Sequence, residues 1–145
     1  MAKSQPEKYR LSMAGEFGVC SELSKRGYDP SITLGNAKAV DIYVPNAKGG
    51  LSRIEVKTSR SKKIVTNFFQ KYFSKTQEPH PDFWVLVYID KENVSHYYVL
   101  THEEMGNEQM RTNGMTTWGK TSGGVDNVPI TDLADYENAW NKIPK

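Results

Sequence analysis

Two short segments decide the fold: Val40-Asp-Ile-Tyr-Val44 and Leu51-Ser-Arg-Ile-Glu-Val-Lys57. Apolar and polar residues alternate in both, as they do in β-strands with one buried face. Residues 45–50, between them, contain proline, asparagine and two glycines, which favour a turn. The pattern therefore predicts a β-hairpin over residues 40–57.

The alternation also predicts which side chains share a face of this hairpin. Successive side chains on a strand point to opposite faces, so Asp41 and Glu55 lie on one face together with Lys57. Closing the turn sets Asp41 opposite or next to Glu55, and such pairs have Cβ atoms about 4.5–5.5 Å apart. Two carboxylates that close together repel unless a cation lies between them. The opposite, core-facing side takes Ile42, Val44, Ile54 and Val56.

A helix ending near Arg26 is predicted ahead of the hairpin. Ser4 and Glu7 have the spacing of an N-terminal capping box, and Gly27 is a common residue at a helix end. Apolar residues recur at helical spacing and mark the face expected to pack on the sheet. These residues are Met13, Phe17, Cys20 and Leu23.

Glu16 adds a third carboxylate from this helix. It lies three and seven positions before Val19 and Leu23, so it sits on or beside the packing stripe. Buried glutamates are rare unless they are paired or bound to a metal. Three converging carboxylates without sulfur or imidazole suit a hard ion, Mg²⁺ or Mn²⁺, that keeps several of its waters.

This residue set fits metal-assisted hydrolysis of a phosphodiester. Asp41 and Glu55 would be direct ligands of an ion that lowers the pKa of a bound water and polarises a phosphoryl oxygen. Lys57 would orient the water or neutralise charge that develops on the phosphate. Three basic residues follow the second strand, where they either grip flanking phosphates or form a solvated loop: Arg60, Lys62 and Lys63.

The remaining chain continues with helices and strands. A helix is predicted over 64–73, a strand buried on both faces over 83–89, its neighbour over 94–100, and a short helix over 132–142, with a further short strand at 32–34. Residues 105–129 show no clear period. The order predicts one α/β domain over residues 1–145, with a central mixed sheet flanked by helices.

Composition limits the class of protein. A chain of 145 residues with 37% hydrophobic and 25% charged residues is ordinary for one globular domain, and its one cysteine and three histidines exclude an internal disulfide and a zinc-finger type of metal site. No apolar run approaches the roughly 20 residues of a membrane span, so we expect a cytoplasmic protein without a membrane partner. Residues 1–75 hold 14 Lys and Arg against 6 Asp and Glu, whereas residues 76–145 hold 5 against 11. This asymmetry indicates an anionic partner for the first half.

Four short segments together resemble the PD-(D/E)XK nuclease superfamily, and most of all its small stand-alone members akin to archaeal Holliday-junction resolvases. They are Ala14-Gly-Glu-Phe-Gly-Val19, Arg26-Gly-Tyr28, Val40-Asp-Ile42 and Arg53-Ile-Glu-Val-Lys-Thr58. Val40 stands where the superfamily pattern has proline, and the acidic residue after it is retained. The resemblance implies a restriction-endonuclease-like αβββαβ core.

The resemblance also implies roles for single residues. Glu16, Asp41 and Glu55 would be metal ligands together with the backbone carbonyl of Val56, and Lys57 would be the catalytic lysine. Resolvase-like members usually act as dimers, so a homodimer is one expectation. The resulting function is a Mg²⁺- or Mn²⁺-dependent endonuclease that hydrolyses DNA, with RNA as the second substrate to consider.

Two alternatives stay open. One is a catalytically silent nuclease-fold module that binds nucleic acid or a protein partner without cleaving. The other is nucleotide binding, because Gly114-Met-Thr-Thr-Trp-Gly-Lys-Thr121 satisfies the P-loop pattern. The flanking residues lack the buried strand and the helix that a P-loop needs, which favours a flexible loop. In a milder functional interpretation, Trp118 and Lys120 contact nucleic acid by stacking and charge.

Overall fold

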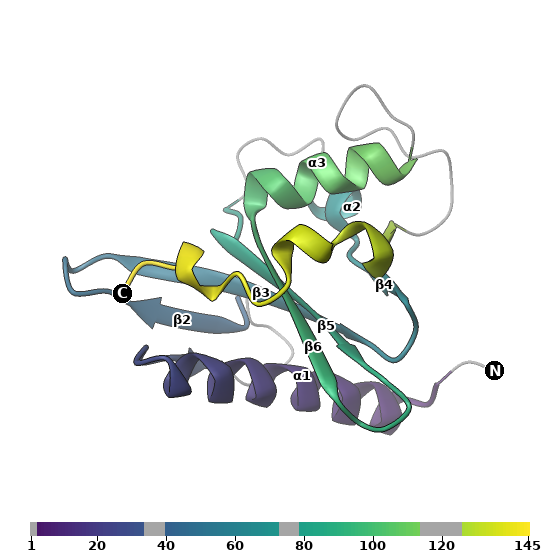
Figure 1. Cartoon of the computed structure of the whole chain (residues 1–145), viewed down its shortest axis with the longest axis horizontal. Helices are drawn as coiled ribbons and strands as arrows, with labels where there is room; N and C mark the ends of the chain where they lie inside the picture. Colours follow the sequence, from purple (N-terminus) through teal and green to yellow (C-terminus); the bar gives the residue numbers. More distant parts are fainter. Residues whose placement is uncertain (1–2, 34–39, 73–78, 114–125) are drawn as a thin grey trace.

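A five-stranded mixed sheet forms the centre of the computed structural model, which describes residues 3–33, 40–72, 79–113 and 126–145 (Figure 1). The strand order is β1-β2-β3-β5-β6. β3 and β5 are parallel, and the other neighbours are antiparallel. The strand bounds are β1 (Ser31–Ile32), β2 (Ile42–Pro45), β3 (Leu51–Ser59), β5 (Phe83–Ile89) and β6 (Ser95–Thr101). The predicted α/β fold with a central mixed sheet is confirmed.

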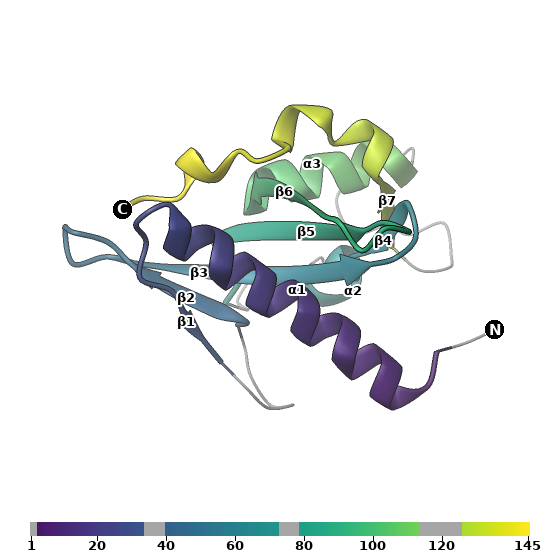
Figure 2. The same ribbon diagram turned by 60° about the horizontal axis from the view of Figure 1, so that its bottom comes forward.

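Helices cover both faces of this sheet (Figure 2). The long helix α1 (Gln5–Lys25) crosses one face, and α2 (Phe68–Tyr72) and α3 (His102–Asn113) lie on the other. A second, two-stranded sheet joins β4 (Lys63–Val65) to β7 (Asn127–Pro129) on the α2 and α3 side. The chain then runs along β6 in three 3-10 turns, η1 (Ile130–Asp132), η2 (Ala134–Tyr136) and η3 (Trp140–Lys142).

The sheet separates two hydrophobic cores. On the α1 side, Val19 and Leu23 pack with the inward residues of the hairpin, which include Ile54 and Val56. On the other side, Trp84 and Leu86 of β5 pack with α2 and α3. Because Trp84 and Leu86 are the register partners of Glu55 and Lys57, those two polar side chains project from the face opposite α1. The predicted alternation along β3 is therefore confirmed.

Helix α1 begins with the predicted capping box of Ser4 and Glu7 and ends before Gly27. The predicted packing face is wrong in part: Leu23 is buried and Cys20 packs against the core, but Phe17 is 53% exposed. The buried residues are Gly15, Glu16, Val19 and Leu23. Gly15 has no side chain and lies directly against Thr58 of β3, so at this point the helix approaches the sheet more closely than a larger residue would allow.

Two predicted helices are wrong in part. Residues 63–65 form strand β4, so only Phe68–Tyr72 of the predicted helix over 64–73 is helical. The partner of β4 is β7, more than sixty positions further along the chain, and local sequence does not reveal such a partner. The predicted helix over 132–142 consists of separate 3-10 turns, and the aperiodic stretch 105–129 contains most of α3 and strand β7. Leu34 of the predicted first short strand lies outside the described residues.

Tyr28 fastens the C-terminal segment to the end of α1. Its buried hydroxyl lies 3.0 Å from the Trp140 carbonyl oxygen and 2.7 Å from the Ile143 carbonyl oxygen, and its single proton is shared between these two acceptors. We expect Tyr28→Phe to lower the free energy of unfolding by about 1–2 kcal/mol, because buried carbonyls lose their donor. Urea denaturation measures this change, with the exposed Tyr9→Phe as the control. Equal stabilities of the two variants would contradict the assigned role.

Among the helices in the described ranges, none combines the length and the apolar character that crossing a bilayer requires.

Candidate active site

The candidate site lies where β2 and β3 separate. The Asn46 N–H donates to the Gly50 carbonyl at the turn, and hydrogen-bonded pairs recur every second residue along the ladder as far as Ile42 and Ile54. The next such pair would join the Val56 N–H to the Val40 carbonyl. Instead, Val56 N–H donates to Asp41 Oδ2 at 2.7 Å, so the Asp41 carboxylate replaces a backbone partner at the point of separation.

Asp41 and Glu55 both lie one position beyond Ile42 and Ile54, the last register pair of β2 and β3. Asp41 directly precedes Ile42, and Glu55 directly follows the Ile42 partner Ile54. Both acidic residues are buried, each with 6% of its surface exposed. Buried carboxylates are costly unless charge or hydrogen bonds compensate them. The predicted placement of Asp41 next to Glu55 therefore has a structural basis in the hairpin register.

Lys57 supplies a positive charge beside these carboxylates. Its Nζ lies 3.4 Å from Glu55 Oε2, and the two side chains extend from the same face of β3. The Lys57 side chain keeps 23% of its surface exposed, whereas that of Glu55 keeps 8%. The ammonium group thus reaches from a buried carboxylate toward solvent, where a substrate phosphate could approach it.

The Val56 carbonyl completes this edge of β3. The N–H and C=O groups of one strand residue point to the same side of the strand in an antiparallel ladder. Since the Val56 N–H points to Asp41, its carbonyl oxygen faces the same edge. Two carboxylates and one carbonyl are oxygen ligands of the kind that Mg²⁺ and Mn²⁺ prefer, and such ions keep several waters of their own. The residues present fit a hard divalent cation.

Glu16 is buried on α1, with 4% of its surface exposed, next to the contact between Gly15 and Thr58. Burial and the Glu16 carboxylate raise the pKa of the Cys20 thiol, which keeps this cysteine protonated beside the core. Among the described residues, no group of three or more His, Cys, Asp or Glu side chains is placed to hold a metal ion. The convergence of Glu16 with Asp41 and Glu55 therefore stays a prediction.

The predicted phosphate-binding residues Arg60, Lys62 and Lys63 lie just beyond β3, in the turn that leads to β4 and at its first residue. All three are exposed. Arg60 Nη1 lies 3.5 Å from the Asp90 carbonyl oxygen, which ties this turn to the end of β5. Their contact with nucleic acid stays a prediction. The P-loop-like segment 114–121, with Trp118 and Lys120, lies outside the described residues.

A histidine pair on the Glu55 side of the sheet is absent from the predicted site. Trp84 is the register partner of Glu55, and its indole N–H donates to His102 Nδ1 at 3.0 Å. The His80 ring stacks on His102 with 4.0 Å between ring centroids. Burial lowers the pKa of His102 to about 4, so its ring is neutral and can accept this hydrogen bond. The spacing of His80, Trp84 and His102 in the sequence does not predict this contact, because these residues come together only in the folded chain.

His102 predicts a pH dependence of stability. The unfolded chain binds a proton at this side chain near pH 6.5, and the folded chain does so only near pH 4. The unfolded state therefore binds more protons between these values, and the free energy of unfolding falls as pH falls from about 6.5 to about 4. We expect a loss on the order of 2 kcal/mol, discounted for partial exposure.

Chemical denaturation at a series of pH values tests this dependence. In His102→Asn, the amide oxygen can still accept from Trp84 but does not titrate. The variant should lose less stability than the wild type over the same pH range. Parallel curves for the two proteins would assign the pH dependence to other groups.

Comparison with known proteins places this geometry in a known fold. The sequence matches no protein-family model and no curated protein. Among solved structures, the bacterial homing endonuclease I-Ssp6803I is similar, with a TM-score of 0.52 and 16% sequence identity. The likeness covers 98% of this chain and 91% of that one. At this identity the likeness shows a shared fold.

Proposed function

We propose that this protein is an endonuclease that hydrolyses phosphodiester bonds of DNA with Mg²⁺ or Mn²⁺. The observation that carries the proposal is the Asp41 carboxylate, held by the Val56 N–H at the separation of β2 and β3, beside the Glu55–Lys57 pair. The nuclease fold shared with the homing endonuclease supports it. We assign the chain to the PD-(D/E)XK type, with the acidic and basic residues that this pattern requires in place.

Each residue has a distinct task in this proposal. Asp41, Glu55 and the Val56 carbonyl hold the cation at the edge of β3. When bound, the divalent cation supplies Lewis-acid activation of water and of the scissile phosphoryl group. Lys57, positioned by Glu55, orients the attacking water and neutralises charge that develops on the phosphate. Glu16 of α1 would be the further acidic residue of the set, and a homodimer is expected from the resolvase resemblance alone.

A cleavage assay with defined metals tests the proposal. The substrates are supercoiled plasmid, linear duplex, a four-way DNA junction and RNA, each with Mg²⁺, Mn²⁺ or EDTA. We expect nicking of at least one DNA form with Mg²⁺ or Mn²⁺ and none with EDTA. A protein that binds these substrates but cuts none with either metal would instead be the silent binding module. Preferential cleavage of RNA would change the substrate assignment.

A further inference from the structure

A hollow of about 420 Å³ lies between the N-terminal half of α1 and the turn that follows β3. Next to Ala14 of its lining, α1 contacts β3 through Gly15 and Thr58. Thr58 points to the α1 side of the sheet, whereas the preceding residue Lys57 projects from the opposite face. Of the residues that line the hollow, only Arg60 belongs to the predicted site. The lining consists of Lys3, Glu7, Arg10, Leu11, Ala14 and Arg60.

The charge of this hollow is positive. Three of its lining residues are cationic, and the single acidic one, Glu7, serves the capping box by accepting from the Ser4 hydroxyl at 3.0 Å. The Ser4 hydrogen bonds, with smaller effects of Arg10 and Lys3, lower the pKa of Glu7. Within the described part of the chain, Lys3, Arg10 and Arg60 form no ion pair with a carboxylate. Their charges are therefore available to an anion.

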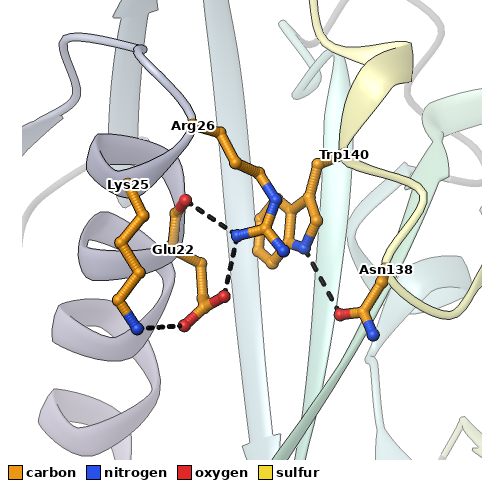
Figure 3. Close-up of polar contacts among 5 residues, drawn as sticks. All are labelled: Glu22, Lys25, Arg26, Asn138 and Trp140. Carbon is orange, nitrogen blue, oxygen red and sulfur yellow. Dashed lines mark hydrogen bonds and ion pairs between the residues drawn. The ribbon is translucent and has the colours of Figure 1, made fainter.

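A second hollow, of about 570 Å³, is the contrasting case, and Figure 3 shows the side chains of Arg26 and Trp140, which line it. It lies between the end of α1 and the C-terminal segment, and Arg26 lines it. There Glu22 pairs with Lys25 at 3.1 Å and with Arg26 at 2.7 Å, and the Arg26 guanidinium lies over the Trp140 ring. These cations already have partners, so this hollow is less suited to an anionic ligand than the hollow between α1 and the β3–β4 turn.

We infer that the hollow between α1 and the β3–β4 turn binds a backbone phosphate of duplex DNA. This inference rests on the proposed function. Arg60 follows Lys57 by three residues and lies just beyond the end of β3, so their Cα atoms are at most roughly 10 Å apart. A B-DNA duplex carries one phosphate charge for about every 1.7 Å of its axis, so a duplex bound at Lys57 presents further backbone phosphates to the hollow. Lys3 and Arg10 then contact these phosphates from the α1 side.

Binding of duplex DNA in EDTA tests the inference separately from cleavage. The probe is a fluorescently labelled duplex of about 30 base pairs, titrated at several salt concentrations. We expect Arg10→Ala and Arg60→Ala each to raise the Kd about 5-fold or more and to reduce the slope of log K against log salt by about 1. The controls remove the same charge elsewhere: Lys48→Ala in the β2–β3 turn, and Lys25→Ala, which is already paired with Glu22.

The outcomes separate this site from the proposed activity. If the wild type binds and the two arginine variants lose affinity while no substrate is cut, the hollow is a DNA site and the nuclease assignment fails. If the wild type cuts DNA and both arginine variants bind like the wild type, or the controls weaken binding equally, the hollow is not the site. Absence of duplex binding, or tighter binding of an RNA duplex of the same sequence, would also overturn the inference.

Discussion

Lys57→Ala and Asp41→Asn are each expected to reduce metal-dependent DNA cleavage at least about 10³-fold, as removal of a metal ligand or of charge stabilisation commonly does. Asp41→Asn removes one negative charge from the cation site, but its amide oxygen can still accept from the Val56 N–H. Lys57→Ala removes the cation that lies 3.4 Å from Glu55 Oε2. Single-turnover rates with Mg²⁺ and with Mn²⁺ measure both effects on the chemical step.

Asp82 offers a matched control for Asp41. Asp82 Oδ2 accepts from the backbone N–H of Arg53 in β3 at 2.8 Å. Asp82, like Asp41, is therefore a carboxylate that binds a backbone amide of β3. Asp82→Asn should therefore share any structural cost of the substitution while cleavage stays close to the wild-type rate. Thermal melts of all variants establish that they fold. Folded Asp41→Asn or Lys57→Ala protein that cuts at the wild-type rate would refute the assigned site.

The core of the candidate site is predictable from sequence because its pattern is local. Period-two alternation and a turn of defined length place Asp41 beside Glu55 and put Lys57 on the Glu55 face. The hydrogen bond from Val56 to Asp41 is different, because it depends on how β2 leaves the ladder. If β2 left the ladder one residue earlier or later, the contact between Val56 and Asp41 would change while the hydrophobic pattern of the sequence stayed the same.

Elements that depend on distant partners are less predictable. Ile64 lies in β4 because β7 offers it a ladder partner, although the aromatic residues that follow favour a helix. Likewise, the apolar spacing of α1 correctly places Leu23 in the core but wrongly includes Phe17, since close approach at Gly15 outweighs burial of one large side chain. The hydrogen bond between Trp84 and His102 joins two neighbouring elements and carries no periodic signal.

Gly15→Ala is expected to lower the free energy of unfolding by about 2 kcal/mol. A Cβ atom at this position would overlap Thr58 Oγ1 and lie 2.9 Å from Thr58 Cβ, so α1 or β3 must shift. Such overpacking costs about 1–3 kcal/mol or occasionally more, and the better helix propensity of alanine offsets up to about 1 kcal/mol of it. Because Glu16 is the next residue, the shift should also lower the cleavage rate. Urea denaturation and single-turnover cleavage measure the two effects.

Gly18→Ala provides the matched control, since it makes the same substitution in the same helix. Its Cβ would lie 2.5 Å from the Tyr97 hydroxyl, the far end of a long side chain that can move aside, so we expect a change within about 1 kcal/mol. Combining Gly15→Ala with Thr58→Ala removes the overlapping oxygen and should recover about 1 kcal/mol relative to the sum of the single effects. Additive single effects, or equal losses at Gly15 and Gly18, would show that the contact with Thr58 does not determine how closely α1 approaches β3.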